Sequence, residues 1–385
     1  MVSKQRTDVV IVGGGVMGCA AAWQLSRRGL RVVVLERSVP GAEASSAAAG
    51  ILGAQMEAHA DGPLVPFALK SRERYAEWSR ELLQETGIDI EYRGSGVVRV
   101  AFSTGEVRAA EREYAFQRRY GCRVESVRGA SLSAVVNCVS EQAQGGVYLP
   151  DDARVDPPRL LTALRIAAER AGATFRSGAY VRRVLIERGR ARGLTLDDGS
   201  AVRGDHVIIA AGSWSSLVEG VPAGSIKVSP ARGQIVELGL PVPVFSPVLL
   251  GPKCYLVPRD DGRVLVGSTL EFVGFRREVT ASAVHHLLGA AIELVPALAQ
   301  ATLRGAWSNF RPYTQDHTPI IGASEVKGLL IATGHYRNGI LWAPITADIL
   351  VSNVLGEPPP LPADVLSPDK RKRARTSSKQ KRRNA

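Results

Sequence analysis

The residues with the clearest chemical role in this 385-residue chain are three glycines, Gly13, Gly15 and Gly18. They match the G-x-G-x-x-G spacing of turns that bind dinucleotides. The first glycine permits a tight turn, the second lets a pyrophosphate approach the backbone, and the third lets a helix pack close to its strand. Glu36 ends the next apolar run, where its carboxylate can accept hydrogen bonds from ribose hydroxyls. These residues predict a dinucleotide site, but they do not choose between NAD and FAD.

A second candidate segment follows Glu36. Residues 37–52 are mostly small, and they include the hydroxyls of Ser45 and Ser46. The segment is too poor in bulky side chains for a core helix and too long for a simple turn. Its backbone could lie flat against a large planar ligand, with the hydroxyls on the pyrophosphate. The alternative is a flexible, alanine-rich loop.

The elements that must position the glycines occur in the expected order. A β-branched run at residues 8–12 precedes the turn, a helical segment follows at 16–28, and an apolar run follows at 32–35. Such a βαβ unit directs the free N–H groups and positive dipole end of its helix at the phosphates. The alternative is a βαβ unit whose glycine turn is incidental.

The rest of the chain favours FAD over NAD. A β-meander at residues 180–203 leads into a buried-type strand at 205–214, a layout typical of FAD-binding domains. A strand, glycine turn and helix recur at 328–355. We therefore predict an α/β fold, in which a discontinuous FAD-binding Rossmann-like domain is joined to an α+β substrate domain with an antiparallel sheet. The expected ranges are 1–87, 150–218 and 320–362 for the first domain, and 88–149 and 219–319 for the second.

Composition indicates an ordinary globular protein, and most of the net charge lies in a C-terminal tail. With 45% hydrophobic and 22% charged residues, the chain resembles an ordinary globular protein. Its formal charge of +12 comes largely from nine basic residues between Lys370 and Arg383, a stretch without acids. We expect residues 363–385 to form a basic, disordered tail, although contact with RNA, acidic lipid or a protein partner stays open.

The cysteines and histidines indicate neither a disulfide framework nor a metal site. The four cysteines form no C-x-x-C pair, and the six histidines include no H-E-x-x-H arrangement. This usage suits a reducing cytoplasm. No apolar run reaches the roughly 18 residues of a membrane span. We expect a cytoplasmic protein without metal or membrane association, and a homo-oligomer is compatible with the sequence.

Two stretches carry a resemblance to a known family. Residues 45–54 and 332–341 resemble the flavin-contacting segments of the glycine oxidase (ThiO-type) branch of the D-amino-acid oxidase and sarcosine oxidase family. The resemblance covers roughly residues 7–360. It implies non-covalent FAD, with Val181 meeting adenine through its backbone. The FAD-binding positions that it implies are Gly13, Gly15, Val16, Met17, Gly18, Glu36, Arg37, Ala44, Ser45, Ala49, Gly50, Ile51, Val181, His335, Tyr336, Arg337, Asn338, Gly339, Ile340 and Leu341.

The same resemblance implies catalytic and substrate-binding roles for Tyr255, Arg311 and Arg337. Arg311 and Tyr255 would hold the substrate carboxylate, since a planar guanidinium binds a carboxylate bidentately. Arg337 would lie near both flavin and substrate. His335 would line the flavin, whereas His317 would be structural.

Three departures from the family pattern matter. Arg311 occupies the locus where sarcosine oxidases carry a flavin-linked cysteine, so we expect dissociable FAD. Leu270 stands where the resemblance implies a methionine, and Lys253 stands where it implies a histidine. These two changes put substrate size and affinity in doubt.

The resemblance implies oxidative deamination of glycine, sarcosine or small D-amino acids by hydride transfer to flavin N5. The products would be an imine or glyoxylate, ammonia and, with O2 as oxidant, H2O2. Iminoacetate from glycine would supply the thiazole of thiamine. The closest rival interpretation is a related oxidase or dehydrogenase that acts on sarcosine, a D-amino acid or proline and could pass electrons to an acceptor other than O2. The others are a tRNA-modifying flavoprotein and, least favoured, a non-catalytic flavin-binding scaffold.

Overall fold

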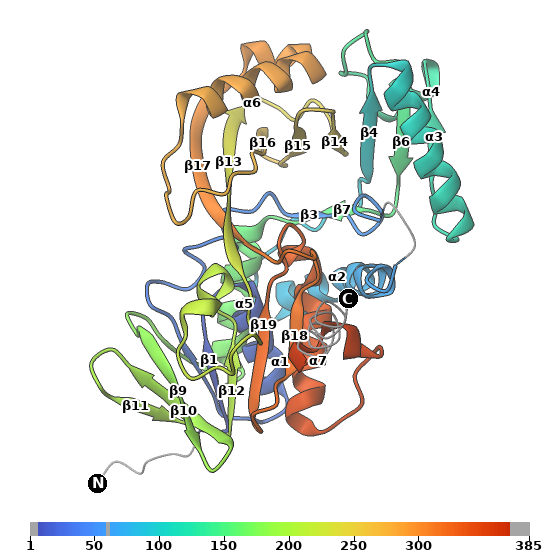
Figure 1. Cartoon of the computed structure of the whole chain (residues 1–385). Helices are drawn as coiled ribbons and strands as arrows, with labels where there is room; N and C mark the ends of the chain where they lie inside the picture. Colours follow the sequence, from blue (N-terminus) through green and yellow to red (C-terminus); the bar gives the residue numbers. More distant parts are fainter. Residues whose placement is uncertain (1–6, 59–61, 370–385) are drawn as a thin grey trace, which may run out of the picture.

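The computed structural model describes residues 7–58 and 62–369 of the chain. Two large β-sheets dominate it, and the long strands β13 (Ser229–Gly239) and β17 (Thr302–Tyr313) reach from one sheet region toward the other (Figure 1). A three-stranded meander and a two-stranded ladder complete the β-structure of the described residues. No helix in this part of the chain is long and apolar enough to cross a bilayer.

The first sheet has six strands in the order β18-β19-β12-β1-β2-β8. All neighbours are parallel except β18, which pairs antiparallel with β19 at one edge. The bounds are β1 (Val9–Val12), β2 (Val32–Leu35), β8 (Thr174–Arg176), β12 (His206–Ile209), β18 (Ile320–Ala323) and β19 (Leu329–Thr333). Strands from three distant parts of the sequence therefore build one sheet.

Both faces of this sheet are covered, which explains its uninterrupted apolar strands. Val9 and Ile11 pack against one hydrophobic cluster with the helices, whereas Val10 and Val12 pack against another with the meander. The helices in the first cluster are α1 (Val16–Arg27), α2 (Val65–Thr86), α5 (Pro157–Arg170) and α7 (Gly339–Leu355). The meander strands are β9 (Val181–Glu187), β10 (Arg190–Leu196) and β11 (Ala201–Arg203). The result is a helix, sheet and meander sandwich.

The second sheet has eight strands in the order β17-β13-β16-β15-β14-β4-β6-β5. Its neighbours are antiparallel except for the parallel pair β14 and β4. The bounds are β4 (Val97–Ala101), β5 (Glu125–Val127), β6 (Gly145–Leu149), β13 (Ser229–Gly239), β14 (Val248–Leu250), β15 (Tyr255–Pro258), β16 (Arg263–Gly267) and β17 (Thr302–Tyr313).

Helix α6 packs on one face of this second sheet, and the opposite face contributes to the cavity described below. Ala49 and Met56 from the first part of the chain pack on that opposite face. The remaining elements are α3 (Thr104–Arg119), α4 (Ala130–Val135), α6 (Ala281–Leu294), β3 (Ile51–Leu52), β7 (Ala153–Arg154), η1 (Gly212–Leu217), η2 (Pro296–Gln300) and η3 (Ala363–Leu366).

These observations confirm the predicted fold class. The strands of the two sheets fall inside the ranges expected for the two domains, although the domain boundaries themselves stay a prediction. The range 363–385, which was expected to be a disordered tail, begins with an ordered segment. Residues 363–366 form η3, and Leu366 is fully buried against the core that contains α7. The basic run from Lys370 to Arg383 lies outside the described residues.

Candidate functional site

A cavity lies where the carboxyl ends of the parallel strands face the second sheet. Val12, Leu35 and Thr333 end β1, β2 and β19 and line the cavity. From the second sheet, Tyr255 and Phe310 line it on β15 and β17. Ligands of open α/β sheets bind outside the carboxyl ends of the strands, so this cavity is the candidate site.

The structure brings nearly all predicted site residues to this cavity. The predicted residues that line it are Gly13, Gly15, Val16, Met17, Glu36, Arg37, Ala44, Ser45, Ala49, Gly50, Ile51, Val181, Tyr255, Arg311, His335, Tyr336, Arg337, Asn338, Gly339 and Ile340. Gly18 and Leu341 do not line it. A Cβ on Gly18 would lie 1.9 Å from the carbonyl oxygen of Gly13, so Gly18 allows close packing of α1 against the turn. The Leu341 side chain is buried in the core.

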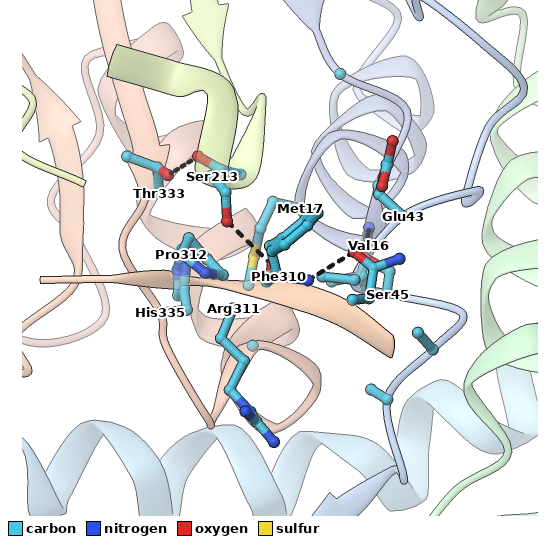
Figure 2. Close-up of a pocket in the computed structure, with 18 of the residues that line it drawn as sticks. Val16, Met17, Glu43, Ser45, Ser213, Phe310, Arg311, Pro312, Thr333 and His335 are labelled. Carbon is cyan, nitrogen blue, oxygen red and sulfur yellow. Dashed lines mark hydrogen bonds between the residues drawn. The ribbon is translucent and has the colours of Figure 1, made fainter. Parts of the chain in front are cut away.

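The glycine turn holds the beginning of α1 open to the cavity. Gly13 has φ +101°, and a Cβ there would lie 2.5 Å from the carbonyl oxygen of Ala210. Gly15 is the N-cap and supplies no side chain. The Val16 amide donates to Ser45 Oγ at 3.0 Å (Figure 2). The turn thus presents helix N–H groups and one hydroxyl, which is the donor set that suits a pyrophosphate.

Glu36 and Arg37 continue the cavity wall beyond β2. Both carboxylate oxygens of the buried Glu36 accept backbone N–H groups, from Gly14 at 2.8 Å and from Ser38 at 3.0 Å. A carboxylate keeps further lone pairs after two such bonds, so acceptance from a ribose is compatible with this arrangement. The Arg37 guanidinium lies 3.9 Å from the ring centroid of Trp214.

Sequence reasoning did not name Trp214 or Glu43 as site residues. Glu43 also lines the cavity and pairs with both Arg37 and Arg277. The small residues and the glycine that follow β12, immediately before Trp214, indicated a turn at this point. Nothing in the local sequence indicated that Trp214 would lie beneath Arg37, which follows β2.

The small-residue loop, residues 37–52, is anchored to side chains from the second sheet and its connections. Trp307 Nε1 donates to the carbonyl of Ala47 at 3.1 Å. Arg259 donates to the carbonyls of Ala49 at 2.8 Å and Val155 at 2.9 Å. The Arg259 side chain is 1% exposed, and burial lowers its pKa to about 10. These bonds favour a ligand-facing wall over the alternative of an unanchored loop.

Arg311 and Tyr255 each lie across a glycine of a neighbouring strand. A Cβ on Gly233 would stand 2.2 Å from Arg311 Nη1, and a Cβ on Gly267 would stand 2.3 Å from the Tyr255 ring. Arg311 donates to the Thr269 carbonyl at 3.1 Å and to Ser268 Oγ at 2.5 Å. In Figure 2, Arg311 and Ser213 lie on opposite sides of the β17 strand.

Arg337 differs from Arg311 in its partner. Its guanidinium forms a 3.0 Å ion pair with Glu57, and both residues line the cavity. Glu57 lies in the turn that follows β3, and sequence reasoning did not identify it. The neighbouring Tyr336 has a raised pKa because burial disfavours the charged phenolate, although Arg311 and Arg337 partly oppose that shift.

The two histidines near the site have different surroundings. His335 lines the cavity, and its Nε2 lies 3.0 Å from Thr346 Oγ1. Burial lowers the pKa of His335 to about 3, so its imidazole is neutral at physiological pH. His317 does not line the cavity; its ring lies 5.5 Å from that of Tyr313 and 5.2 Å from that of Tyr336.

Two of the three departures from the family pattern, Leu270 and Lys253, lie outside the cavity wall. Lys253 forms a 2.7 Å surface ion pair with Glu293, and Leu270 is 51% exposed. Neither lines the cavity. The doubt about substrate size that these changes raised therefore finds no support in the lining residues.

The groups that line the cavity fit FAD. It combines the glycine turn and open helix end, an acid after the second strand, and a small-residue loop. A second helix, α7, begins at Gly339, which also lines the cavity, and its N-cap Asn338 makes no side-chain cap. Two helix N-termini therefore offer positive dipole ends to one ligand.

Comparisons with known proteins agree with this geometry. The model of the DAO family, described as FAD dependent oxidoreductase, matches residues 8–352. Glycine oxidase from Geobacillus kaustophilus is 38% identical over 91% of this chain and 93% of its own length. The crystal structure of glycine oxidase from Geobacillus kaustophilus superposes with a TM-score of 0.89, at 36% identity, over 94% of this chain and 98% of that one.

Another similar protein is longer than this chain. The bifunctional protein ThiO/ThiG from Synechocystis sp. is 36% identical over 92% of this chain, but the match covers 52% of that protein. This chain thus spans about half of the bifunctional relative.

Proposed function

Because this chain belongs to the family of FAD-dependent oxidoreductases, we propose that it catalyses the oxidative deamination of glycine and other small amines such as sarcosine or small D-amino acids. The relatives named glycine oxidase support this substrate class. The observation that carries the proposal is the position of Arg311, a carboxylate-binding side chain in the same cavity as the glycine turn. Among the described residues, no carboxylate lies within ion-pair distance of Arg311.

Substrate binding falls to Arg311 and Tyr255. The bonds to Ser268 and to the Thr269 carbonyl fix the guanidinium plane, leaving its charge for a substrate carboxylate. Bidentate binding restricts the orientation of that carboxylate, and the Tyr255 phenol can donate a further hydrogen bond. Holding the carboxylate of so small a molecule limits the directions of its Cα–H bond to rotation about one single bond, and such orientation contributes to the rate.

Bound FAD supplies the two-electron acceptor for the substrate. The chain's contribution at that point is electrostatic, because the N-terminus of α7 favours negative charge nearby. His335 is neutral and bonded to Thr346, so we assign it a lining role. The amine must therefore react in its unprotonated form without help from a histidine.

Three finer proposals accompany this function. Arg311 stands at the locus of the flavin-linked cysteine, which supports dissociable FAD. The similarity to ThiO/ThiG supports the supply of iminoacetate for the thiazole of thiamine. The four free thiols, Cys19, Cys122, Cys138 and Cys254, support a cytoplasmic location.

An amine panel tests the proposal. Purified protein saturated with FAD is given glycine, sarcosine, proline and small D-amino acids, while oxygen consumption, H2O2 formation and dye reduction are recorded. Oxygen consumption with glycine and equal H2O2 formation support an oxidase. Dye reduction without oxygen consumption supports the rival dehydrogenase, and preference for another amine supports the related sarcosine or D-amino-acid enzyme.

A truncation addresses the tRNA-modifying rival, which rests on the basic run beyond the described residues. A chain ending at Asp369 keeps the buried Leu366 and removes that run. We expect unchanged amine oxidation. Loss of activity on truncation would favour the rival.

A further inference from the structure

We propose that Glu57 makes the site selective for amines that carry a single carboxylate, because it neutralises Arg337. This inference rests on the proposed function and specifies its substrate class. Arg337 would otherwise be a second free guanidinium in the cavity that contains Arg311. Removal of the Glu57 charge should therefore admit substrates with a second carboxylate.

The partners of the two arginines support this assignment. Within residues 7–58 and 62–369, Arg311 donates only to neutral oxygens, on Ser268 and Thr269. Arg337 faces the Glu57 carboxylate at 3.0 Å. Both arginines and Glu57 influence the phenol of Tyr336 electrostatically, so all four side chains share one region of the cavity.

The other charged residues that line the cavity leave Arg311 as the one cation without an acidic partner among the described lining residues. Glu36 accepts two backbone N–H groups, and Glu43 pairs with Arg37 and with Arg277. Among the described lining residues, the uncompensated charge near the predicted substrate groups is therefore that of Arg311. One such charge matches one carboxylate.

The turn that carries Glu57 is anchored from beneath. Asp152, which is fully buried, accepts hydrogen bonds from the backbone amides of Gln55 at 3.1 Å and Met56 at 2.8 Å. Arg72 pairs with the same carboxylate at 2.8 Å. The Glu57 side chain is 20% exposed, whereas that of Arg337 is 52% exposed. The acid is thus the more buried member of the pair, and its negative charge compensates the positive charge of the arginine.

The ion pair between Glu57 and Arg337 would disfavour binding of a second carboxylate for two reasons. The second carboxylate would be repelled by Glu57, and it would have to displace Glu57 to reach Arg337. With glutamine at position 57 the repulsion disappears and the Arg337 guanidinium becomes available. Because charge-assisted bonds to arginine are strong but a half-exposed pair is screened by solvent, we expect an effect of about tenfold.

Binding of two unreactive ethers tests the inference directly. Methoxyacetate carries one carboxylate, and diglycolate carries two on the same ether framework. Their dissociation constants are measured on FAD-saturated protein from the change in flavin absorbance. For Glu57→Gln we expect the preference for diglycolate over methoxyacetate to rise about tenfold. The double variant Glu57→Gln, Arg337→Gln should lose that gain.

A matched control removes an ion pair of the same type outside the cavity. Glu293→Gln leaves Lys253 unpaired on the surface and should keep the wild-type preference. Parallel kinetics with glycine and iminodiacetate, the amine analogue of diglycolate, should show the same rise in relative kcat/KM. An unchanged ether preference in Glu57→Gln, or a gain that survives the double variant, would overturn the inference.

The outcomes separate this inference from the proposed function. If no amine is oxidised but the ether preference shifts as expected, the proposed function fails and the charge selection stands. If glycine is oxidised and the ether preference does not change, the proposed function stands and the charge selection by Glu57 fails.

Discussion

The ring of Tyr255 lies over Gly267, its direct partner across the β15 and β16 ladder. A Cβ on Gly267 would approach the ring to 2.3 Å. Arg311 likewise lies over a glycine of the neighbouring strand, Gly233, which is two residues along β13 from its direct partner Ala231. The two side chains proposed to hold the substrate therefore depend on the absence of side chains beneath them.

We predict that Gly267→Ala displaces Tyr255 and raises KM for the amine about tenfold, with FAD still bound. The expected size corresponds to one lost hydrogen bond of about 1.4 kcal/mol. Steady-state kinetics measure it, and the flavin spectrum monitors the cofactor. Gly289→Ala in α6, where a Cβ meets nothing within 4 Å, is the control and should leave KM unchanged. An equal KM in both variants would show that the contact between Tyr255 and Gly267 does not affect substrate binding.

For Arg311→Ala we expect retained flavin and loss of substrate binding. A bidentate bond to a charged group is worth a few kcal/mol, so kcat/KM should fall by roughly two orders of magnitude. Arg311→Lys should recover part of the loss, because lysine keeps the charge without the planar fork. Kinetics unchanged from wild type in the alanine variant would place the substrate elsewhere.

Gly15 and Gly18 should respond differently to substitution. A side chain on Gly15 meets only Ser45 Oγ, at 3.1 Å, before it enters the cavity, whereas one on Gly18 meets the Gly13 carbonyl at 1.9 Å. Gly15→Leu should therefore fold but purify without flavin colour. Gly18→Leu should be destabilised, with a lower melting temperature even without FAD. Circular dichroism and flavin content together distinguish the two, and a yellow Gly15→Leu protein would contradict the assigned pyrophosphate position.

The neutral His335 predicts a pH effect on stability. Burial lowers its pKa from 6.5 to about 3, so between these values the unfolded chain binds a proton that the folded chain does not. Stability contributed by this group is therefore full above about pH 6.5 and falls as the pH drops toward 3, by at most about 1.4 kcal/mol per pH unit. In His335→Gln the loss of stability on acidification should be smaller by up to this amount. Urea unfolding at pH 7 and pH 5 measures it; identical pH slopes in both proteins would refute the shift.

The sequence predicted those features that rest on short-range patterns. The strand, turn and helix around Gly13 follow from local spacing, and the apolar runs of β1 and β12 follow from burial on both faces. The resemblance added Arg311 and Tyr255, although no local pattern marked either residue as functional.

The features that sequence reasoning missed depend on contacts between distant segments. Arg259 reaches Ala49 from 210 positions away, and Trp307 reaches Ala47 from 260. Glu57 meets Arg337 only because β3 and the start of α7 converge on one cavity. Similarly, Leu366 follows a polar, proline-rich stretch and is buried because it packs against the core around α7. Such contacts have no periodic signal in the chain.

The central claim is that this cavity holds FAD and presents it to a small amino acid bound by Arg311. Anaerobic titration of the purified yellow protein with glycine, sarcosine and small D-amino acids tests it most directly. The account predicts that at least one of these amines abolishes the oxidised flavin absorbance and that admission of air restores it. Protein that shows no flavin absorbance even after incubation with FAD, or bound flavin that none of these amines reduces, would contradict the account.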